Sequence, residues 1–167
     1  MKMIDEGLLF SIPLSEGMFG FGQLIVWQEP IFYMIAYDLR SESLGIADEQ
    51  ELRPILMGNF FDVLIRNGRW QPIRQLPVPK VVFPCFKIKI GDRFYVESWD
   101  RERKREATPD DLDVLKPRTD YGPIILENAL KAHFGLVPWE IMFEPLRVEN
   151  VTMSSKRLTP QRREPSH

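Results

Sequence analysis

The chain has 167 residues, of which 44% are hydrophobic and 28% are charged, and it carries 22 basic and 24 acidic side chains. A chain of this length can bury one sizeable core without disulfides or metals. The balance of charge excludes a disordered, highly charged chain and a strongly basic polyanion-binding protein. The single cysteine, Cys85, excludes an internal disulfide framework, and with only His133 and His167 beside it a Cys/His zinc site is excluded too. We therefore expect no cofactor and no metal.

The first residues, MKMIDEGLLFSIPL, do not form a signal peptide pattern. They lack a basic start, and Ser11 and Pro13 interrupt the apolar run. No stretch approaches the roughly 18 uninterrupted apolar residues that a membrane span needs. We expect a cytoplasmic protein that does not bind membranes, with Cys85 reduced.

Three alternating runs open the chain and predict three strands. Residues 8–14 and 19–27 alternate between apolar and other side chains, and Ser15, Glu16 and Gly17 supply a turn between them. The third run, over residues 31–39, is apolar on both faces. It is therefore predicted as a central strand, buried on both sides.

Polar residues follow, and the next predicted element is a short helix around ADEQEL, residues 47–52, ended by Pro54. FFDVLIRNGRW, residues 60–70, is then predicted as a β-hairpin, because Asn67 and Gly68 tolerate the positive φ angles of a type I′ turn. In that hairpin Phe61, Val63 and Ile65 would face the core, whereas Asp62 and Arg66 would face solvent.

The middle of the chain predicts further strands. QPIRQLPVPKVVFP, residues 71–84, contains four prolines, which cannot donate in a ladder, so we expect an edge strand and then an extended loop. Residues 86–90 alternate Phe and Ile with lysine and predict a half-buried strand. Gly91 and Asp92 would turn it into a partner strand, RFYVESW.

Two helices are predicted in the C-terminal half. Thr108-Pro109-Asp110-Asp111 has a hydroxyl for the N-cap, proline at the first position and acidic residues at the positive end of the dipole. PIILENALKAHFG, residues 123–135, carries an apolar stripe and ends in glycine. The expected fold is α+β, with a mainly antiparallel, curved or partly barrel-like β-sheet and one or two C-terminal helices. A single domain would span residues 1–145, and residues 146–167 would form a flexible, polar, basic tail.

Gly20 and Gly22 lie among aromatic residues on the second strand. Packing or sheet curvature is the favoured interpretation, and a ligand contact is the alternative. The surrounding aromatic residues would stack nucleobases only beside cations, yet residues 7–39 contain no Lys or Arg. These aromatic side chains are Phe19, Phe21, Trp27, Tyr33 and Tyr37, and we expect them in the core.

The segment WDRERKREA, residues 99–107, carries four basic side chains but also three acidic ones. A solvated, mixed-charge loop is favoured, and a polyanion contact is the alternative. His133, near a helix end, and Cys85, at a strand entry, are interpreted as structural residues. We expect no catalytic residue.

Asp110, Asp111 and Asp113 cluster at a predicted helix start, where the helix dipole alone accounts for two of them. They lack the further ligands of a metal site. A second interpretation is an acidic surface that meets a basic partner.

Two blocks of the sequence resemble one protein family. GLLFSIPLSEGMFGFGQLI, residues 7–25, resembles the opening of the immunity protein 26 family of bacterial polymorphic toxin systems, and NGRWQPIRQLPVP, residues 67–79, resembles its Gly-x-Trp block. The positions that carry the resemblance are Gly7, Pro13, Leu14, Gly17, Phe19, Phe21, Gly22, Gly68, Trp70 and Pro77. The chain departs from the family at Leu8, where Asp is common, and at Arg74, where a glycine follows the tryptophan.

The resemblance implies a protein that binds and inhibits a cognate toxin and has no catalytic residues. Asp110, Asp111 and Asp113 are the residues we expect at a toxin interface. No direct contact with nucleic acid is expected. Two alternatives remain open, namely a small RNA-binding or RNA-cleaving protein with an SH3-like barrel and an adaptor domain for a partner that is not a toxin.

Overall fold

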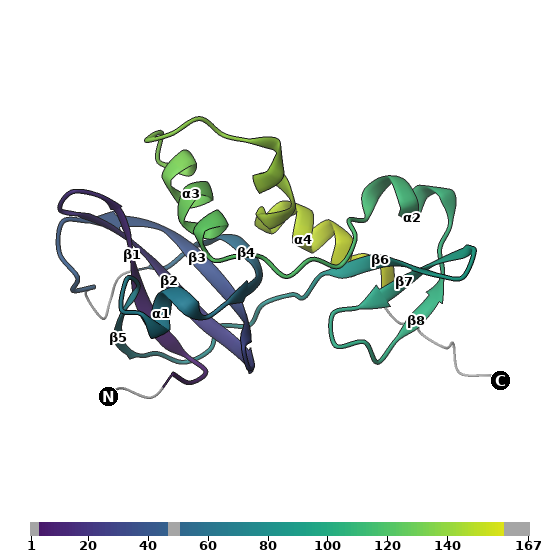
Figure 1. Ribbon diagram of the computed structural model, residues 1–167, viewed down its shortest axis with the longest axis horizontal. Helices are drawn as coiled ribbons and strands as arrows, with labels where there is room; N and C mark the ends of the chain where they lie inside the picture. Colours follow the sequence, from purple (N-terminus) through teal and green to yellow (C-terminus); the bar gives the residue numbers. More distant parts are fainter. Residues whose placement is uncertain (1–3, 47–50, 159–167) are drawn as a thin grey trace. The chain divides into compact units, whose positions relative to one another are not determined.

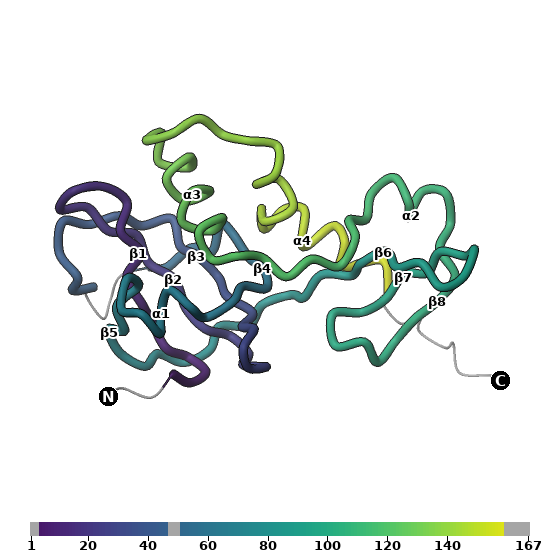
Figure 2. The backbone as a smooth tube through the Cα atoms, viewed as in Figure 1, coloured from purple at the N-terminus to yellow at the C-terminus, as the bar shows by residue number. Residues whose placement is uncertain are grey.

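A computed structural model describes residues 4–46 and 51–158 of the chain. The chain divides into two compact units. Unit 1 comprises Met1–Lys80 and Thr119–Val148, and unit 2 comprises Val81–Arg118 and Glu149–His167. The chain thus leaves unit 1, builds most of unit 2, returns to unit 1 and enters unit 2 again, a path that can be followed along the tube in Figure 2. Compactness alone does not show independent folding, so the single domain expected over residues 1–145 stays a prediction.

Unit 1 contains a five-stranded antiparallel sheet with the order β4-β3-β2-β1-β5 (Figure 1). Its strands are β1 (Leu8–Ser15), β2 (Met18–Gln28), β3 (Ile31–Ser41), β4 (Pro54–Phe61) and β5 (Gln71–Gln75). The three N-terminal strands were predicted from their alternation, and β3 lies inside the sheet as expected. β5 is the predicted edge strand. Because β4 and β5 lie at opposite edges and do not pair, the sheet is not closed into a barrel.

The core of unit 1 lies between this sheet and helix α3 (Ile124–His133), which covers one face of it (Figure 1). Leu126, Ala129 and Leu130 form the apolar stripe of α3 and are fully buried. Gly20 makes room for this helix, since a Cβ there would lie 2.5 Å from Leu130 Cδ2. Close packing of helix on sheet therefore accounts for that glycine.

The hairpin predicted over residues 60–70 is wrong. Val63–Arg66 forms a short helix, α1, in which Val63 is 51% exposed. Asp62, the residue before the helix, is buried and paired with Arg66. An ion pair four residues apart favours a helical turn. Beyond it Trp70 enters the core and stacks on Phe10, with ring centroids 5.2 Å apart. These contacts outweigh the local turn preference of Asn-Gly.

The same correction changes the expected faces at Phe61, Asp62 and Val63, whereas Arg66 is exposed as predicted. Ile65 is buried as predicted, but Phe61 is 36% exposed and Asp62, expected in solvent, is only 5% exposed. Gly68 does adopt the positive φ that its type allows, at +83°. It ends α1 rather than turning a hairpin.

Unit 2 contains a three-stranded antiparallel sheet, β6-β7-β8, and the helical segments that border it. Its elements are β6 (Cys85–Ile90), β7 (Arg93–Ser98), β8 (Lys104–Glu106), α2 (Pro109–Val114), most of α4 (Val148–Ser155) and the 3-10 helix η2 (Lys156–Leu158). The predicted pairing of β6 and β7 around Gly91 and Asp92 is confirmed, although Ile90 is 48% exposed. Cys85, Val96 and Leu115 form a small core on which Leu158 packs.

These elements confirm an α+β fold with antiparallel sheets and helices in the C-terminal half. Residues 148–158, predicted as part of a flexible tail, form α4 and η2 instead. Residues 159–167, the rest of that tail, and residues 47–50 of the predicted short helix lie outside the described residues. Within the described ranges, no helix is long and apolar enough to cross a membrane.

Candidate protein-binding surface

The predicted acidic cluster starts helix α2 in unit 2. Thr108 is the N-cap, and its hydroxyl accepts a hydrogen bond from the Asp111 backbone while the Asp111 carboxylate accepts one from the Thr108 backbone. This reciprocal pair is a capping box, and the local sequence is sufficient to specify it.

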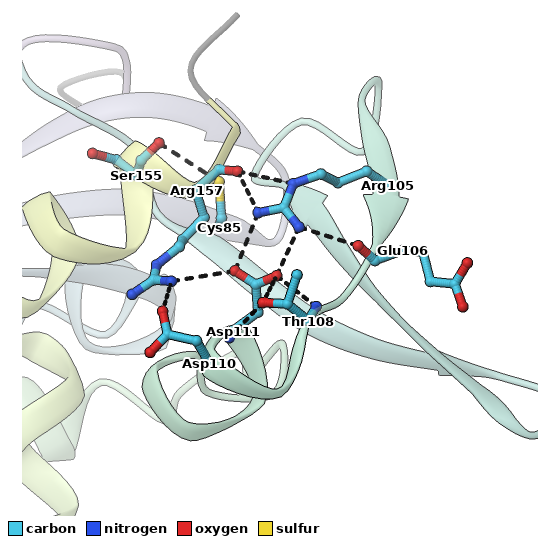
Figure 3. A network of polar contacts seen from close by, with 8 residues as sticks. All are labelled: Cys85, Arg105, Glu106, Thr108, Asp110, Asp111, Ser155 and Arg157. Carbon is cyan, nitrogen blue, oxygen red and sulfur yellow. Dashed lines mark hydrogen bonds and ion pairs between the residues drawn. The ribbon is translucent and has the colours of Figure 1, made fainter. Parts of the chain in front are cut away.

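Asp111 lies at the centre of the polar network in Figure 3. Its carboxylate accepts hydrogen bonds from Arg105 Nη1 at 2.7 Å and Nη2 at 3.1 Å, and Arg157 Nη1 lies 3.4 Å from its Oδ1. The Arg105 guanidinium, with the Thr108 hydrogen bonds, holds the pKa of Asp111 well below its usual range despite burial. The side chain of Asp111 is only 1% exposed.

The three aspartates therefore differ in what they can do. Asp111 is committed to an internal network and is too buried to contact a partner. Asp110 is 74% exposed and pairs with Arg157, and Asp113 is exposed. A contribution of Asp110 and Asp113 to a partner surface stays a prediction, whereas the burial of Asp111 removes it from that set.

The basic segment over residues 99–107 binds the chain itself. Arg103 Nη1 donates to the carbonyl oxygen of Leu158 at 2.7 Å, and Arg105 Nη2 donates to that of Arg157 at 2.8 Å. Two of the four cations in this segment thus hold Arg157 and Leu158 (Figure 3 shows Arg105). This arrangement favours a structural role over a polyanion contact for Arg103 and Arg105.

Most of the glycine and aromatic residues singled out in β2 and β3 lie in the core. Phe21, Tyr33 and Tyr37 are at most 2% exposed, and a Cβ on Gly22 would lie 2.6 Å from the Phe10 ring. The aromatic faces of these three residues are thus covered by protein, as the sequence indicated. The expectation is wrong for Trp27, which is 39% exposed near the end of β2, and Phe19 is only partly buried.

The histidine and cysteine also have structural environments. His133 Nε2 lies 2.8 Å from Asp38 Oδ1, and His133 together with Arg53 holds the pKa of Asp38 below its ordinary value. Cys85 is buried beside the Ser155 carbonyl, and this burial raises the pKa of its thiol. A buried, protonated thiol is a poor nucleophile.

A different surface emerges in unit 1, over the segment that leads from α3 through the 3-10 helix η1 (Ile141–Leu146). Phe143 and Leu146 of this segment are buried in the core of unit 1. Trp139 donates to Glu144 Oε1 at 2.6 Å, and the Arg147 guanidinium lies 3.9 Å from the centroid of the Trp139 indole ring. The segment is therefore fixed on both sides of its exposed residues.

Between these anchors lie Ile141 and Met142, which point into solvent. Ile141 is 88% exposed and Met142 is 50% exposed. Leu136 and Val137, earlier in the same segment, are 42% and 39% exposed. Adjacent large apolar side chains held in water are typical of a surface that binds another molecule.

The sequence pattern does not reveal this surface. The run LVPWEIMFEPL, residues 136–146, is apolar at most positions and has neither a helical nor a strand period, so its pattern does not separate anchors from exposed residues. The available signal was an apolar run that begins after the helix-ending Gly135 and has no predicted partner element.

In the part of the chain that the structure describes, no group of three or more His, Cys, Asp or Glu residues is placed to hold a metal ion. Comparison with protein-family models, with curated proteins and with solved structures finds no match. The resemblance to an immunity family therefore depends on the two sequence blocks alone.

Proposed function

We propose that this protein is an immunity protein that binds and neutralises a cognate bacterial toxin through a non-catalytic protein–protein interaction. The proposal starts from the two blocks, residues 7–25 and 67–79, that resemble the immunity protein 26 family. Each block consists of residues that many sheets use, so either block alone is weak support for the family.

The observation that carries the proposal is that the two blocks form one structural unit. β1 pairs with β5, so that Leu9 lies opposite Arg74, and Trp70 stacks on Phe10. The buried Gln23 side chain donates to the carbonyl oxygens of Gly7 at 3.1 Å and Pro77 at 3.3 Å. Residues of the two blocks thus contact one another across a long separation in the sequence, so both resembling blocks belong to one scaffold, as membership of one family requires.

The two departures from the family pattern have local explanations. Leu8 is 2% exposed in the core of unit 1, a position where an unpaired aspartate would be costly. Arg74 lies within β5, and its Nη2 donates to the Ile46 carbonyl oxygen at 3.0 Å. An extended strand at Arg74 replaces the turn that a glycine would allow.

Inhibition by binding is physically within reach of such a chain. A dissociation constant of 1 nM corresponds to about 12 kcal/mol, and interfaces of about 1,600 Å² reach such values through a few buried anchors. The exposed apolar residues of the η1 segment can supply anchors of this kind.

The test is co-expression with the toxin encoded next to this gene. We expect cells that make both proteins to grow, cells that make the toxin alone to die, and the purified pair to co-elute from a sizing column. Killing by every adjacent candidate toxin in the presence of this protein would contradict the proposal. If this protein alone were toxic and cleaved total RNA, the ribonuclease alternative would replace it, and capture of a defined partner other than a toxin would favour the adaptor.

A further inference from the structure

We infer that the surface formed by Ile141 and Met142, here called the η1 knob, is the apolar anchor of the partner interface. We also infer that its occupant is a basic protein surface with an apolar socket. This inference rests on the proposed function, because it names the part of the molecule with which the toxin is bound.

The backbone that carries the knob is fixed by its neighbours before any partner binds. Ile141 is 88% exposed, yet Phe143, two residues later, is 2% exposed and packs edge-on against Trp139. The Phe143 backbone N–H donates to the Glu140 carbonyl oxygen at 3.0 Å. A backbone held in place before binding loses little conformational freedom on binding, so burial of the side chain that it carries contributes more fully to affinity.

Burial of an exposed isoleucine or methionine side chain lowers the free energy of the system. Interface anchors characteristically fill pockets on the partner. The exposure of Ile141 exceeds that of every other exposed large hydrophobic residue described, of which the next is Val63 at 51%. Among the residues that the structure describes, Ile141 is thus the large apolar side chain that a covering partner would remove most fully from water.

The charge beside the knob indicates that the partner surface is basic. Glu140 precedes the knob and is exposed, and Glu144 follows it with 42% of its side chain exposed. Glu144 and the nearby Arg147 pair at 3.1 Å and offset each other, so Glu140 supplies the net negative charge beside the knob. Acidic side chains also outnumber basic ones in the sequence of unit 1. A rim of basic residues on the partner would complement this surface.

The experiment measures binding of the full-length protein to the purified toxin domain encoded next to its gene. We expect Ile141→Asp to weaken binding about 30-fold or more, as for an interface hot spot, with an unchanged thermal midpoint because the side chain is exposed. Ile90→Asp, the same substitution at a 48% exposed position in unit 2, is the matched control and should bind like the wild type. Glu140→Lys should slow association at low salt and flatten its salt dependence.

Each other outcome overturns the inference in a distinct way. Wild-type affinity in Ile141→Asp would show that the toxin binds elsewhere, and the proposed function would stand. If light scattering showed that the wild type self-associates and Ile141→Asp does not, a second copy would be the occupant. If the wild type bound none of the adjacent toxins, the proposed function would fail and the inference with it.

Discussion

Gly7 and Gly22 of unit 1 are glycine for different physical reasons. Gly7 has φ +86°, a backbone conformation that residues with a side chain rarely adopt, and a Cβ there would lie 2.5 Å from the Leu76 carbonyl oxygen. Gly22 has an ordinary backbone conformation but no space, because a Cβ would meet the Phe10 ring at 2.6 Å and the Ile35 carbonyl oxygen at 3.0 Å. The sequence indicates that such glycines serve packing, but the residues that surround them come from other strands.

We predict that Gly22→Ala destabilises the protein by about 2 kcal/mol, the usual cost of overpacking a core. The Phe10 ring cannot move freely, since it stacks on Trp70 with the planes 6° apart. Urea denaturation followed by tryptophan fluorescence measures the loss. Gly122→Ala is the control, because a Cβ at that glycine would have no neighbour within 4 Å. Equal stability of the two variants would refute the packing explanation.

At the scale of the element, the two short helices show what sequence can and cannot specify. Helix α2 was predictable, since Thr108, Pro109 and Asp111 form its N-terminus from adjacent residues. Helix α1 was not, because the signal of Asn67-Gly68 for a hairpin is local. The contacts that oppose it, namely the stacking of Trp70 on Phe10 and the hydrogen bond from the Asp62 backbone N–H to the Pro30 carbonyl oxygen, join distant segments.

The Asp111 network predicts a specific pH dependence. The pKa of Asp111 is lowered in the folded state, so its contribution is complete above the unfolded value near 3.9 and is lost as pH falls toward the folded value. Asp111→Asn should therefore cost about 1–3 kcal/mol at pH 7, and the difference from the wild type should shrink below about pH 4.

Thermal unfolding of the wild type and Asp111→Asn at several pH values checks this prediction. Asp113→Asn changes the same charge at an exposed position of the same helix and should leave stability within about 0.5 kcal/mol. A constant difference between Asp111→Asn and the wild type from pH 7 down to pH 2 would show that the ionised carboxylate does not stabilise the fold.

For the whole molecule, the return of the chain to unit 2 is the feature that the sequence conceals most. Residues 154–157 are polar, and this segment is held through the backbone carbonyl oxygens of Arg157 and Leu158, which accept from Arg105 and Arg103. Carbonyl acceptors are present in every residue, so side-chain patterns do not reveal such contacts. The η1 knob could not be predicted for a related reason. An isoleucine in an apolar run is expected in a core, and only the tertiary contacts show that Ile141 is exposed.

The small core of unit 2 depends on this return, and Cys85 can report on it. As the chain's single cysteine, Cys85 is 5% exposed and packs in the cluster that Leu158 covers. A thiol-specific reagent reaches it only when this cluster opens, and burial also raises its pKa and lowers the thiolate fraction.

We predict that Leu158→Asp speeds the reaction of the full-length chain with Ellman's reagent about tenfold or more, because a carboxylate is costly against an apolar core. Met153→Asp, at a position of α4 that is 47% exposed, is the control and should react at the wild-type rate. Equal rates in all three proteins would show that the C-terminal segment does not protect this core.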